Sequence, residues 1–367
     1  MAENLTVVFG PEIWGQQTQG GISRYFSELI CGLHSKGVKV HTLVAPNSNA
    51  YLTLLPEETI VYLESERIEV LKDSFRKINL ENSAEIIFHP TYFEEKNVRL
   101  AKSLNFTVVV TVFDLIADLF QKKSLKNLFS TNSRSRICIS ADRVLAISVN
   151  TKRDIEKIYK IPCDKIGVTL LGTSLPNSEK PTELKRIPLE PYLLYVGKRD
   201  GYKNFEIVIH ALAEFTGNKE LGVIAFGGGE FTHSEIEMIS QLELSHRIIQ
   251  VDGSDHDLRN AYSNALALVY PSLYEGFGLP PIEAMQNLCP VIASSAGSIP
   301  EICGRFALYF EPTDLSMLKN HISLLLEGNY TINLGDAKKW ADDYSWDKTV
   351  DATIAEYKIA MEIRHEK

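Results

Sequence analysis

Short apolar runs alternate along the chain with amphipathic stretches of helical period. Apolar runs of strand length occur at residues 5–9, 38–44, 192–196, 221–226 and 266–270. Stretches with apolar positions on one helical face follow several of them, at residues 21–33, 205–215 and 282–287. Strands that alternate with helices predict parallel sheets joined by right-handed crossovers. Because the pattern starts anew in the second half, we predict an α/β fold with two similar domains.

The boundary between these domains is predicted inside residues 172–191. This stretch holds four prolines of the fifteen in the chain and little apolar content. We place an N-terminal domain at residues 1–178 and a C-terminal domain at residues 179–345. Ser345 is a good N-cap for a last helix at residues 346–367, whose apolar face must pack on another apolar surface.

The totals restrict the class of protein. A chain of 367 residues fits two domains, and a net charge of −9 argues against nucleic acid as the main partner. The N-terminus lacks a basic region before an apolar core, and no apolar run approaches the ~18 residues that span a bilayer. Five scattered cysteines predict free thiols in a reducing compartment. These features predict a soluble, cytoplasmic protein.

The most informative segment lies at residues 270–301. It places Glu275 and Glu283 eight positions apart, around a turn that contains Gly276 and Gly278. Glycine lets backbone N–H groups come close to a ligand, and a helix that starts after the turn adds an anion site. Carboxylates accept hydrogen bonds from vicinal hydroxyls. We therefore expect Glu275 in the loop and Glu283 in the first helical turn, both facing one cleft that suits a sugar nucleotide.

The filled pattern EGFGLPPIE, from Glu275 to Glu283, resembles the E-x7-E motif of retaining glycosyltransferases of family 4. The resemblance implies the GT-B fold, in which two Rossmann-like domains face each other across a cleft and the C-terminal helix crosses back to the N-terminal domain. It implies that the N-terminal domain binds the acceptor and the C-terminal domain the nucleotide sugar. The alternative is an ordinary strand-turn-helix in which Glu283 merely favours the positive helix end.

Two basic residues follow the strand at residues 192–196. Arg199 and Lys203 match the family's Arg and Lys, which contact the donor diphosphate. Cleavage of a sugar–phosphate bond develops negative charge that needs a metal ion or fixed cations. With Glu275 they form the predicted catalytic set, although a basic loop of this kind is by itself more often a solvated surface. The positions that the resemblance assigns to donor binding are Gly20, Gly21, Gly197, Gly253, Gly276, Phe277, Gly278, Leu279 and Glu283.

Three residues of the first half are candidates for the acceptor site. His89 follows an apolar run and would end a strand at the ligand edge, although a lone histidine is more often structural. Phe113 and Asp114 follow another run, where many members of the family have His-Asp. Phe113 thus removes one expected contact with the transferred sugar. Asp114 either meets the acceptor or caps a helix.

Asp255 and Asp257 match the D-x-D metal motif of the other glycosyltransferase class. Their context, SDHDLRNAY, instead predicts an N-cap and an acidic first turn before an amphipathic helix. We therefore expect a structural role, no metal site and no cofactor, the nucleotide sugar being the donor substrate.

The segment at residues 120–136 contains five basic residues and no acid. Leucines and a phenylalanine interleave with them, which suits an anionic membrane surface or a phosphate-bearing lipid acceptor. A solvated helix face explains the pattern equally well. We expect peripheral contact with the inner face of the membrane as one possibility.

Together these features predict an enzyme, a retaining and metal-independent hexosyltransferase. The expected donor is GDP-mannose, with a UDP-sugar next, and the acceptor is a glycan or lipid-linked intermediate of cell-surface polysaccharide or lipopolysaccharide synthesis. Three alternatives stay open: a sugar-nucleotide epimerase, a phosphorylase, and a catalytically inactive sugar-nucleotide-binding protein of the same fold. An epimerase would turn over donor without acceptor, and a phosphorylase would carry a coloured pyridoxal cofactor.

Overall fold

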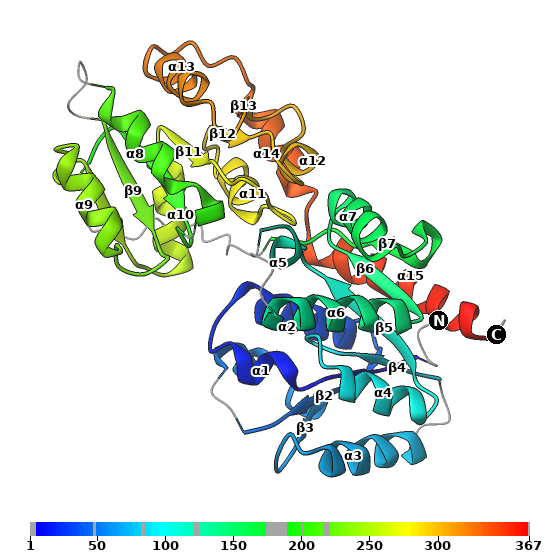
Figure 1. Cartoon of the computed structure of the whole chain (residues 1–367). Coiled ribbons are helices and arrows are strands. Elements are labelled where there is room, and N and C mark those ends of the chain that lie inside the picture. Colours follow the sequence, from blue (N-terminus) through cyan, green and yellow to red (C-terminus); the bar gives the residue numbers. More distant parts are fainter. Residues whose placement is uncertain are drawn as a thin grey trace. The chain divides into compact units, whose positions relative to one another are not determined.

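The structure is a computed structural model that describes residues 5–46, 49–81, 85–120, 125–173, 189–199, 201–215 and 221–365. For residues 81, 125–132 and 365 it describes the backbone alone. The chain forms two compact units, which Figure 1 shows in sequence colours. Unit 1 comprises Met1–Gly172 with Ser345–Lys367, and unit 2 comprises Thr173–Tyr344. The predicted boundary at residue 178 lies outside the described residues.

Unit 1 is built on a parallel sheet with the strand order β3-β2-β1-β4-β5-β6-β7. Its strands are β1 (Leu5–Phe9), β2 (Lys39–Val44), β3 (Ile60–Tyr62), β4 (Glu85–His89), β5 (Thr107–Val112), β6 (Arg143–Ala146) and β7 (Ile166–Val168). The chain builds outward from β1 to β3 and then returns to add β4 on the other side of β1. The strand order therefore reverses between β1 and β4, which is the place where open α/β sheets bind ligands.

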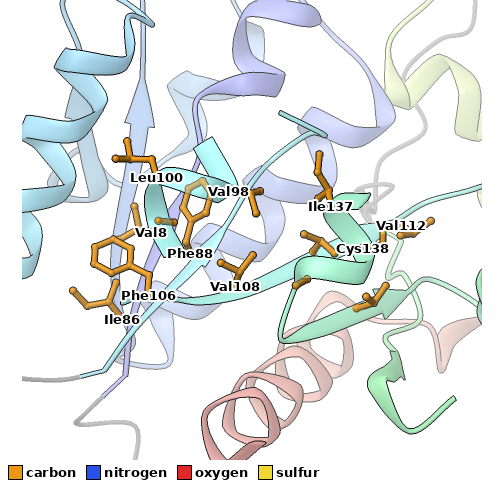
Figure 2. Close-up of a cluster of buried hydrophobic side chains, with 14 of the residues drawn as sticks. Val8, Ile86, Phe88, Val98, Leu100, Phe106, Val108, Val112, Ile137 and Cys138 are labelled. Atoms are coloured by element: carbon orange, nitrogen blue, oxygen red, sulfur yellow. The ribbon is translucent and has the colours of Figure 1, made fainter. Parts of the chain in front are cut away.

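Helices connect these strands and bury their apolar faces on the sheet. They are α1 (Glu12–Gln16), α2 (Gly21–Ser35), α3 (Ile68–Glu81), α4 (Glu95–Ser103), α5 (Ile116–Phe120), α6 (Leu125–Ser140) and α7 (Val149–Tyr159), with short 3-10 turns at Ala50–Leu54, Glu57–Thr59 and Cys163–Lys165. Figure 2 shows part of the core, where Val8, Phe88 and Val108 from three neighbouring strands gather with Val98 and Ile137 from α4 and α6. Strands buried on both faces explain why the apolar runs are continuous.

The last helix, α15 (Trp346–His365), belongs to unit 1 and packs on α2, β5 and β6. Glu356 on this helix accepts a hydrogen bond from Arg143 Nε at 2.5 Å. Tyr357 is fully buried. The apolar face seen in the sequence therefore covers the first sheet, and the predicted return of the C-terminal helix is confirmed.

Unit 2 is built on a second parallel sheet with the order β10-β9-β8-β11-β12-β13. Its strands are β8 (Tyr192–Val196), β9 (Gly222–Phe226), β10 (Ile248–Val251), β11 (Ala267–Tyr270), β12 (Val291–Ser294) and β13 (Leu308–Phe310). Here the order reverses between β8 and β11. The two units thus share one topology, and each has a switch point beside its first strand.

The helices of unit 2 are α8 (Phe205–Ala213), α9 (His233–Gln241), α10 (Asp255–Asn264), α11 (Leu279–Gln286), α12 (Ile299–Cys303), α13 (Leu315–Leu326) and α14 (Leu334–Asp342), with a 3-10 turn at Gly201–Lys203. The predicted strands are found within one residue of their expected bounds. Helix α11 begins three residues earlier than predicted, because the first helical turn tolerates Pro280 and Pro281. Among the described residues, no helix combines the length and the apolar content that crossing a bilayer requires.

Candidate functional site

The site in unit 2 is centred on an ion pair at the switch point of the sheet. Lys203 follows β8 and Glu275 follows β11, and the Lys203 Nζ lies 2.7 Å from the Glu275 Oε1. The Lys203 side chain is 20% exposed and that of Glu275 is 9% exposed. The ammonium also lies 5.9 Å from the centre of the Tyr270 ring. A partly exposed cation and a carboxylate therefore share the edge where a ligand is expected.

The turn after Glu275 is held by a second loop. The Ser298 hydroxyl lies 2.9 Å from the Glu275 carbonyl oxygen and 2.6 Å from that of Phe277. A Cβ atom on Gly297, which has φ +59°, would lie 2.7 Å from the Glu275 carbonyl oxygen. Only glycine fits there. Ser298 and Gly297 were not among the predicted site residues. Their position shortly after the apolar run of β12 places them at the ligand edge of the sheet, and this was the available signal.

Glu283 lies on α11, in the second turn rather than the predicted first, because the helix begins at Leu279. Its Oε2 accepts a hydrogen bond of 3.0 Å from the Tyr262 hydroxyl. Burial and the neighbouring Glu283 carboxylate raise the pKa of Tyr262 well above its usual value. Leu279 starts the helix and Gly278, at φ +121°, precedes it as the N-cap residue. The glycine turn and both glutamates therefore form one contiguous strand-turn-helix.

The Arg199 side chain is held by several contacts within unit 2. Its Nε lies 2.9 Å from the Glu235 Oε1, and its terminal nitrogens donate to the backbone carbonyls of Gly227, Gly229 and Glu230. Four of the five N–H groups of the guanidinium are thus engaged. The side chain is only 4% exposed. Arg199 thus fixes the glycine loop after β9, and its predicted contact with the donor diphosphate stays a prediction.

Asn204 is a further positioning residue that sequence reasoning missed. Its backbone is left-handed, with φ +55°, and its Nδ2 donates to the carbonyls of Pro271 at 3.1 Å and Pro312 at 2.7 Å. Because Pro271 follows β11, Asn204 joins the loop of Lys203 to the loop of Glu275. Asparagine tolerates this conformation better than most residues, and that was the available signal.

Gly197 and Gly253 follow β8 and β10, so both lie at the same edge of the sheet. Gly197 has φ +103° and donates its N–H to the Phe226 carbonyl at 2.9 Å. Asp257 closes a capping box with Ser254, its carboxylate accepting from the Ser254 backbone N–H at 2.8 Å. The predicted N-cap and acidic first turn are therefore confirmed, and the absence of a metal site stays a prediction.

Comparison with known proteins now identifies the domain that carries this site. Residues 178–341 match the family model described as glycosyl transferases group 1. This chain carries a group 1 glycosyltransferase domain. The match confirms the resemblance to glycosyltransferases, and it does not specify family 4.

Relatives that match part of the chain agree with this family. The O-antigen chain mannosyltransferase B of Escherichia coli is 29% identical over 60% of this chain and 61% of its own length. The O-antigen chain mannosyltransferase RfbU of Salmonella typhimurium is 34% identical over 47% of each chain. The matched part thus spans between 47% and 61% of these two relatives.

A solved structure supports the fold. Sucrose-phosphate synthase from Thermosynechococcus elongatus is 21% identical, covers 98% of this chain and 99% of its own, and has a TM-score of 0.73. Such a distant likeness concerns the fold alone. With the two doubly wound sheets and the return of α15, it confirms the predicted GT-B architecture for the chain that carries the group 1 domain.

In unit 1, outside the group 1 domain, Gly20 and Gly21 lie at the start of α2. Gly20 is the N-cap residue, and a Cβ atom there would lie 2.4 Å from the Gln17 Oε1. The Ser23 hydroxyl donates to the Gly20 carbonyl at 3.0 Å. The turn is therefore tight and leads directly into a long helix. Its predicted contact with the donor phosphates stays a prediction.

His89 lies at the end of β4 as predicted, but it is fully buried. Its Nδ1 lies 2.6 Å from the Tyr357 hydroxyl and its Nε2 lies 2.9 Å from the Thr111 hydroxyl. Burial lowers the pKa of the imidazole to about 3. Both ring nitrogens are thus occupied by the protein, and the contact of His89 with the acceptor stays a prediction. The residue ties β4 to β5 and α15.

Phe113 and Asp114 follow β5 as expected. The Phe113 ring packs edge-on against Tyr25, with centroids 5.0 Å apart. The Asp114 Oδ1 accepts a hydrogen bond of 3.0 Å from the Ile116 backbone N–H. This bond supports the capping alternative for Asp114, because Ile116 is the first residue of α5. An acceptor contact for either residue stays a prediction.

The basic segment at residues 120–136 is only partly described. Lys122 and Lys123 lie outside the described residues. Arg134 lies 3.9 Å from the Asp118 carboxylate, and Arg136 lies 3.4 Å from that of Glu95. Acids from outside the segment therefore offset part of the charge excess seen in the sequence.

Proposed function

We propose that this protein is a retaining, metal-independent hexosyltransferase that moves the sugar of a nucleotide diphosphate sugar to a hydroxyl of a glycan or lipid-linked acceptor. The observation that carries the proposal is the Lys203–Glu275 ion pair beside the glycine turn, at the switch point of the group 1 domain. A cation next to the backbone of a glycine turn suits a leaving diphosphate. A carboxylate in the same place suits the hydroxyls of a sugar.

Each residue has a distinct role in this proposal. Lys203 and the backbone of Gly276–Leu279 stabilise the negative charge that develops on the diphosphate. Glu275 accepts hydrogen bonds from the donor hexose. Glu283, already bonded to Tyr262, uses its other oxygen for the ribose hydroxyls. The base lies near Gly253, at the end of β10, and Gly20 and Gly21 of unit 1 approach the phosphates.

Retention follows from a displacement on one face of the sugar. The bond between the anomeric carbon and the phosphate oxygen breaks, and the acceptor oxygen bonds to the same face. The leaving phosphate oxygen takes the proton of the acceptor hydroxyl. No nucleophilic side chain and no metal ion are needed, because the fixed cation and the backbone N–H groups carry the charge. The anomeric coupling constant of the product by NMR tests this step.

The names of the relatives favour mannose as the transferred sugar. Two are O-antigen chain mannosyltransferases and a third is an MMP alpha-(1->4)-mannosyltransferase of Mycolicibacterium hassiacum. We therefore propose GDP-mannose as the donor and a polysaccharide intermediate as the acceptor. A solved neighbour crystallised in complex with UDP makes a UDP-sugar the next candidate.

A thermal-shift panel with GDP-, UDP- and ADP-sugars in the presence of EDTA tests the donor site. A nucleotide sugar at a hundredfold excess over its dissociation constant stabilises the native state by about 2.7 kcal/mol. We expect one nucleotide to stabilise the wild type and the Lys319→Ala control, but neither Lys203→Ala nor Glu283→Ala. Binding that requires Mn²⁺ would contradict metal independence. Donor turnover without acceptor that yields an epimer would favour the epimerase, and binding without transfer would favour an inactive binder.

We also propose peripheral membrane contact through residues 120–136. Its support is the basic content of the segment and the exposed side chains of Leu119 and Phe120, which are 44% and 46% exposed. Co-sedimentation with vesicles tests it. Binding should rise with the fraction of anionic lipid and fall with salt, and equal binding to neutral vesicles would contradict it.

A further inference from the structure

A buried tyrosine of α10 supports the second glutamate of the site in unit 2. Tyr262 is fully buried, and its hydroxyl donates to the Glu283 Oε2 at 3.0 Å. Glu283 itself is 8% exposed. Burial, together with the neighbouring carboxylate, raises the pKa of Tyr262 well above its usual value. The hydroxyl therefore keeps its proton and acts as a donor that fixes one oxygen of the Glu283 carboxylate.

The direction of the helices places this tyrosine beneath the carboxylate. Helices α10 and α11 begin after the carboxyl ends of β10 and β11. Side chains of a helix lean toward its N-terminus, which here is the ligand edge of the sheet. Tyr262 is the eighth residue of α10, and Glu283 is the fifth of α11. At a rise of about 1.5 Å per residue, Tyr262 lies nearly one turn deeper along its helix. Its hydroxyl therefore reaches the carboxylate from the side away from the ligand edge.

A second link joins α10 to the backbone of Glu283. The Arg259 Nε donates to the Asn287 Oδ1 at 3.1 Å, and the Asn287 Nδ2 donates to the Glu283 carbonyl at 2.8 Å. Arg259 and Tyr262 are three positions apart, so both lie on one face of α10. Glu283 is therefore held by this helix at its carbonyl and, separately, at its carboxylate.

A carboxylate held in this way distinguishes a diol from a single hydroxyl. Its two oxygens accept about four hydrogen bonds in total, so the bond from Tyr262 still permits two from a ligand. Ribose offers two vicinal hydroxyls, at its 2′ and 3′ positions, to such a fixed acceptor. A 2′-deoxyribose offers only one. Sites built to bond a hydroxyl reject an analogue that lacks it, because a buried polar group then loses its partner.

We infer that Tyr262 is a positioning residue that orients Glu283 toward both hydroxyls of a ribose, and that the donor is therefore a ribonucleoside diphosphate sugar. The inference rests on the proposed function, in which Glu283 contacts the ribose. It narrows the class of donor, because thymidine diphosphate sugars carry 2′-deoxyribose and are excluded. All of the residues that carry it belong to unit 2.

Isothermal titration calorimetry on the full chain tests the inference with matched pairs of nucleotides. The probes are GDP, UDP and ADP, each compared with its 2′-deoxy counterpart. For the pair that binds most tightly, we expect the wild type to favour the ribose form by at least about tenfold. In Tyr262→Phe, which removes only the hydroxyl, this ratio should fall below about threefold, because binding of the ribose form weakens. The affinity for the 2′-deoxy form should stay within about twofold of the wild type.

A matched control and a double variant separate positioning from a general loss of structure. Tyr309→Phe removes a hydroxyl that donates to the Gly304 carbonyl in the same unit, and its ratio should equal that of the wild type. Glu283→Gln should lower the ratio by itself. Addition of Tyr262→Phe to Glu283→Gln should lower it no further, because the tyrosine acts through that carboxylate. A further fall in the double variant would contradict the inference.

Asn287→Ala tests the second link, and it serves in place of Tyr262→Phe if that variant does not fold. It removes the hydrogen bond to the Glu283 carbonyl and leaves the Tyr262 hydroxyl in place. The ratio should fall at least twofold below that of the wild type. An unchanged ratio would mean that α10 does not position Glu283.

The outcomes separate this inference from the proposed function. Equal binding of the ribose and 2′-deoxy forms by the wild type would overturn the inference and leave the proposed function intact. An unchanged ratio in folded Tyr262→Phe would do the same, as would equal weakening of both forms, which is the result expected of a merely structural tyrosine. A wild type that binds none of the nucleotides would overturn both.

Discussion

The two units place different chemistry at the same topological position. In unit 2 the residues after β8 and β11 form an ion pair, Lys203 with Glu275, that remains partly exposed. In unit 1 the residues after β1 and β4 form a buried network in which Glu12 accepts from the neutral groups of Thr91 and Asn97. The shared topology selects the edge of the sheet, and the side chains select the ligand.

The contrast in charge separates two kinds of ligand. A fixed ammonium group beside a glycine turn stabilises a diphosphate, and a carboxylate network with neutral donors disfavours one. Unit 2 thus presents a fixed positive charge at this edge, and unit 1 presents a buried carboxylate held by neutral donors. Four predictions test this comparison, in order of decreasing effect.

Lys203→Ala should have the largest effect. Removal of a charge-stabilising donor from a catalytic site costs about 10²–10³ in rate, and here it also leaves the Glu275 carboxylate without its ion-pair partner. We expect kcat/KM for the nucleotide sugar to fall by that factor, while Lys203→Arg retains part of the activity. The control is Lys319→Ala, which removes another lysine of unit 2 that pairs with a glutamate, Glu214. A loss below threefold for Lys203→Ala would remove it from the proposed site.

His89→Leu should change stability rather than activity. The substitution removes the hydrogen bonds of His89 to the Tyr357 hydroxyl and to the Thr111 hydroxyl. Together these losses should lower the free energy of unfolding by about 3 kcal/mol. Urea unfolding measures the loss, and activity per folded molecule should stay within twofold of the wild type. His233→Leu is the control, because His233 is 89% exposed. Normal stability with lost activity would restore His89 to the acceptor site.

The same residue predicts how stability depends on pH. His89 is neutral in the folded state, with a pKa of about 3, against the ordinary histidine value of 6.5. Below pH 6.5 the unfolded state therefore binds more protons, so this contribution is complete above pH 6.5 and is lost as the pH falls toward 3. One such group changes the free energy of unfolding by about 1.4 kcal/mol per pH unit. The slope for the wild type should exceed that for His89→Leu by this amount between pH 6 and pH 4, and equal slopes would contradict it.

The sequence predicted the strand ends correctly and the side-chain partners poorly. Period and apolar content determine where β4 ends, so His89 was placed at the right edge of the sheet. They contain no information about Tyr357, which lies 268 positions away on α15 and occupies one ring nitrogen. The same holds for Arg199, whose partner Glu235 lies on a helix 36 positions further along. Burial and long-range pairing come from the tertiary fold.

Motifs whose residues interact within one short segment were predicted more accurately, because their contacts do not depend on distant parts of the chain. Glu275 and Glu283 fall on one strand-turn-helix, and Ser254 with Asp257 forms the capping box that the SDHD pattern predicts. The buried network around Glu12 was not predicted. Its residues come from three separate segments, and a lone buried glutamate leaves no signal in a single sequence.

Asn204 gives the smallest and most specific prediction, since it positions Lys203 without being expected to touch the ligand. Asn204→Gly keeps the left-handed backbone and loses the two hydrogen bonds to the Pro271 and Pro312 carbonyls. Asn204→Ala loses the same bonds and also places in the left-handed conformation a residue that tolerates it less well than glycine or asparagine. This strain should cost about 1–2 kcal/mol of stability. Thermal unfolding should therefore rank the wild type above Gly, and Gly above Ala.

The kinetic effect of Asn204→Gly should appear mainly in KM for the nucleotide sugar, by about threefold to tenfold, because the loop that presents Lys203 loses its anchor to the loop of Glu275. Asn105→Gly is the matched control: Asn105 also has a left-handed backbone, with φ +65°, but lies in unit 1. Its KM for the nucleotide sugar should equal that of the wild type. An equal rise of KM in Asn204→Gly and Asn105→Gly would mean that any such substitution raises KM. The position of Lys203 at the switch point of unit 2 would then not depend on the hydrogen bonds of Asn204.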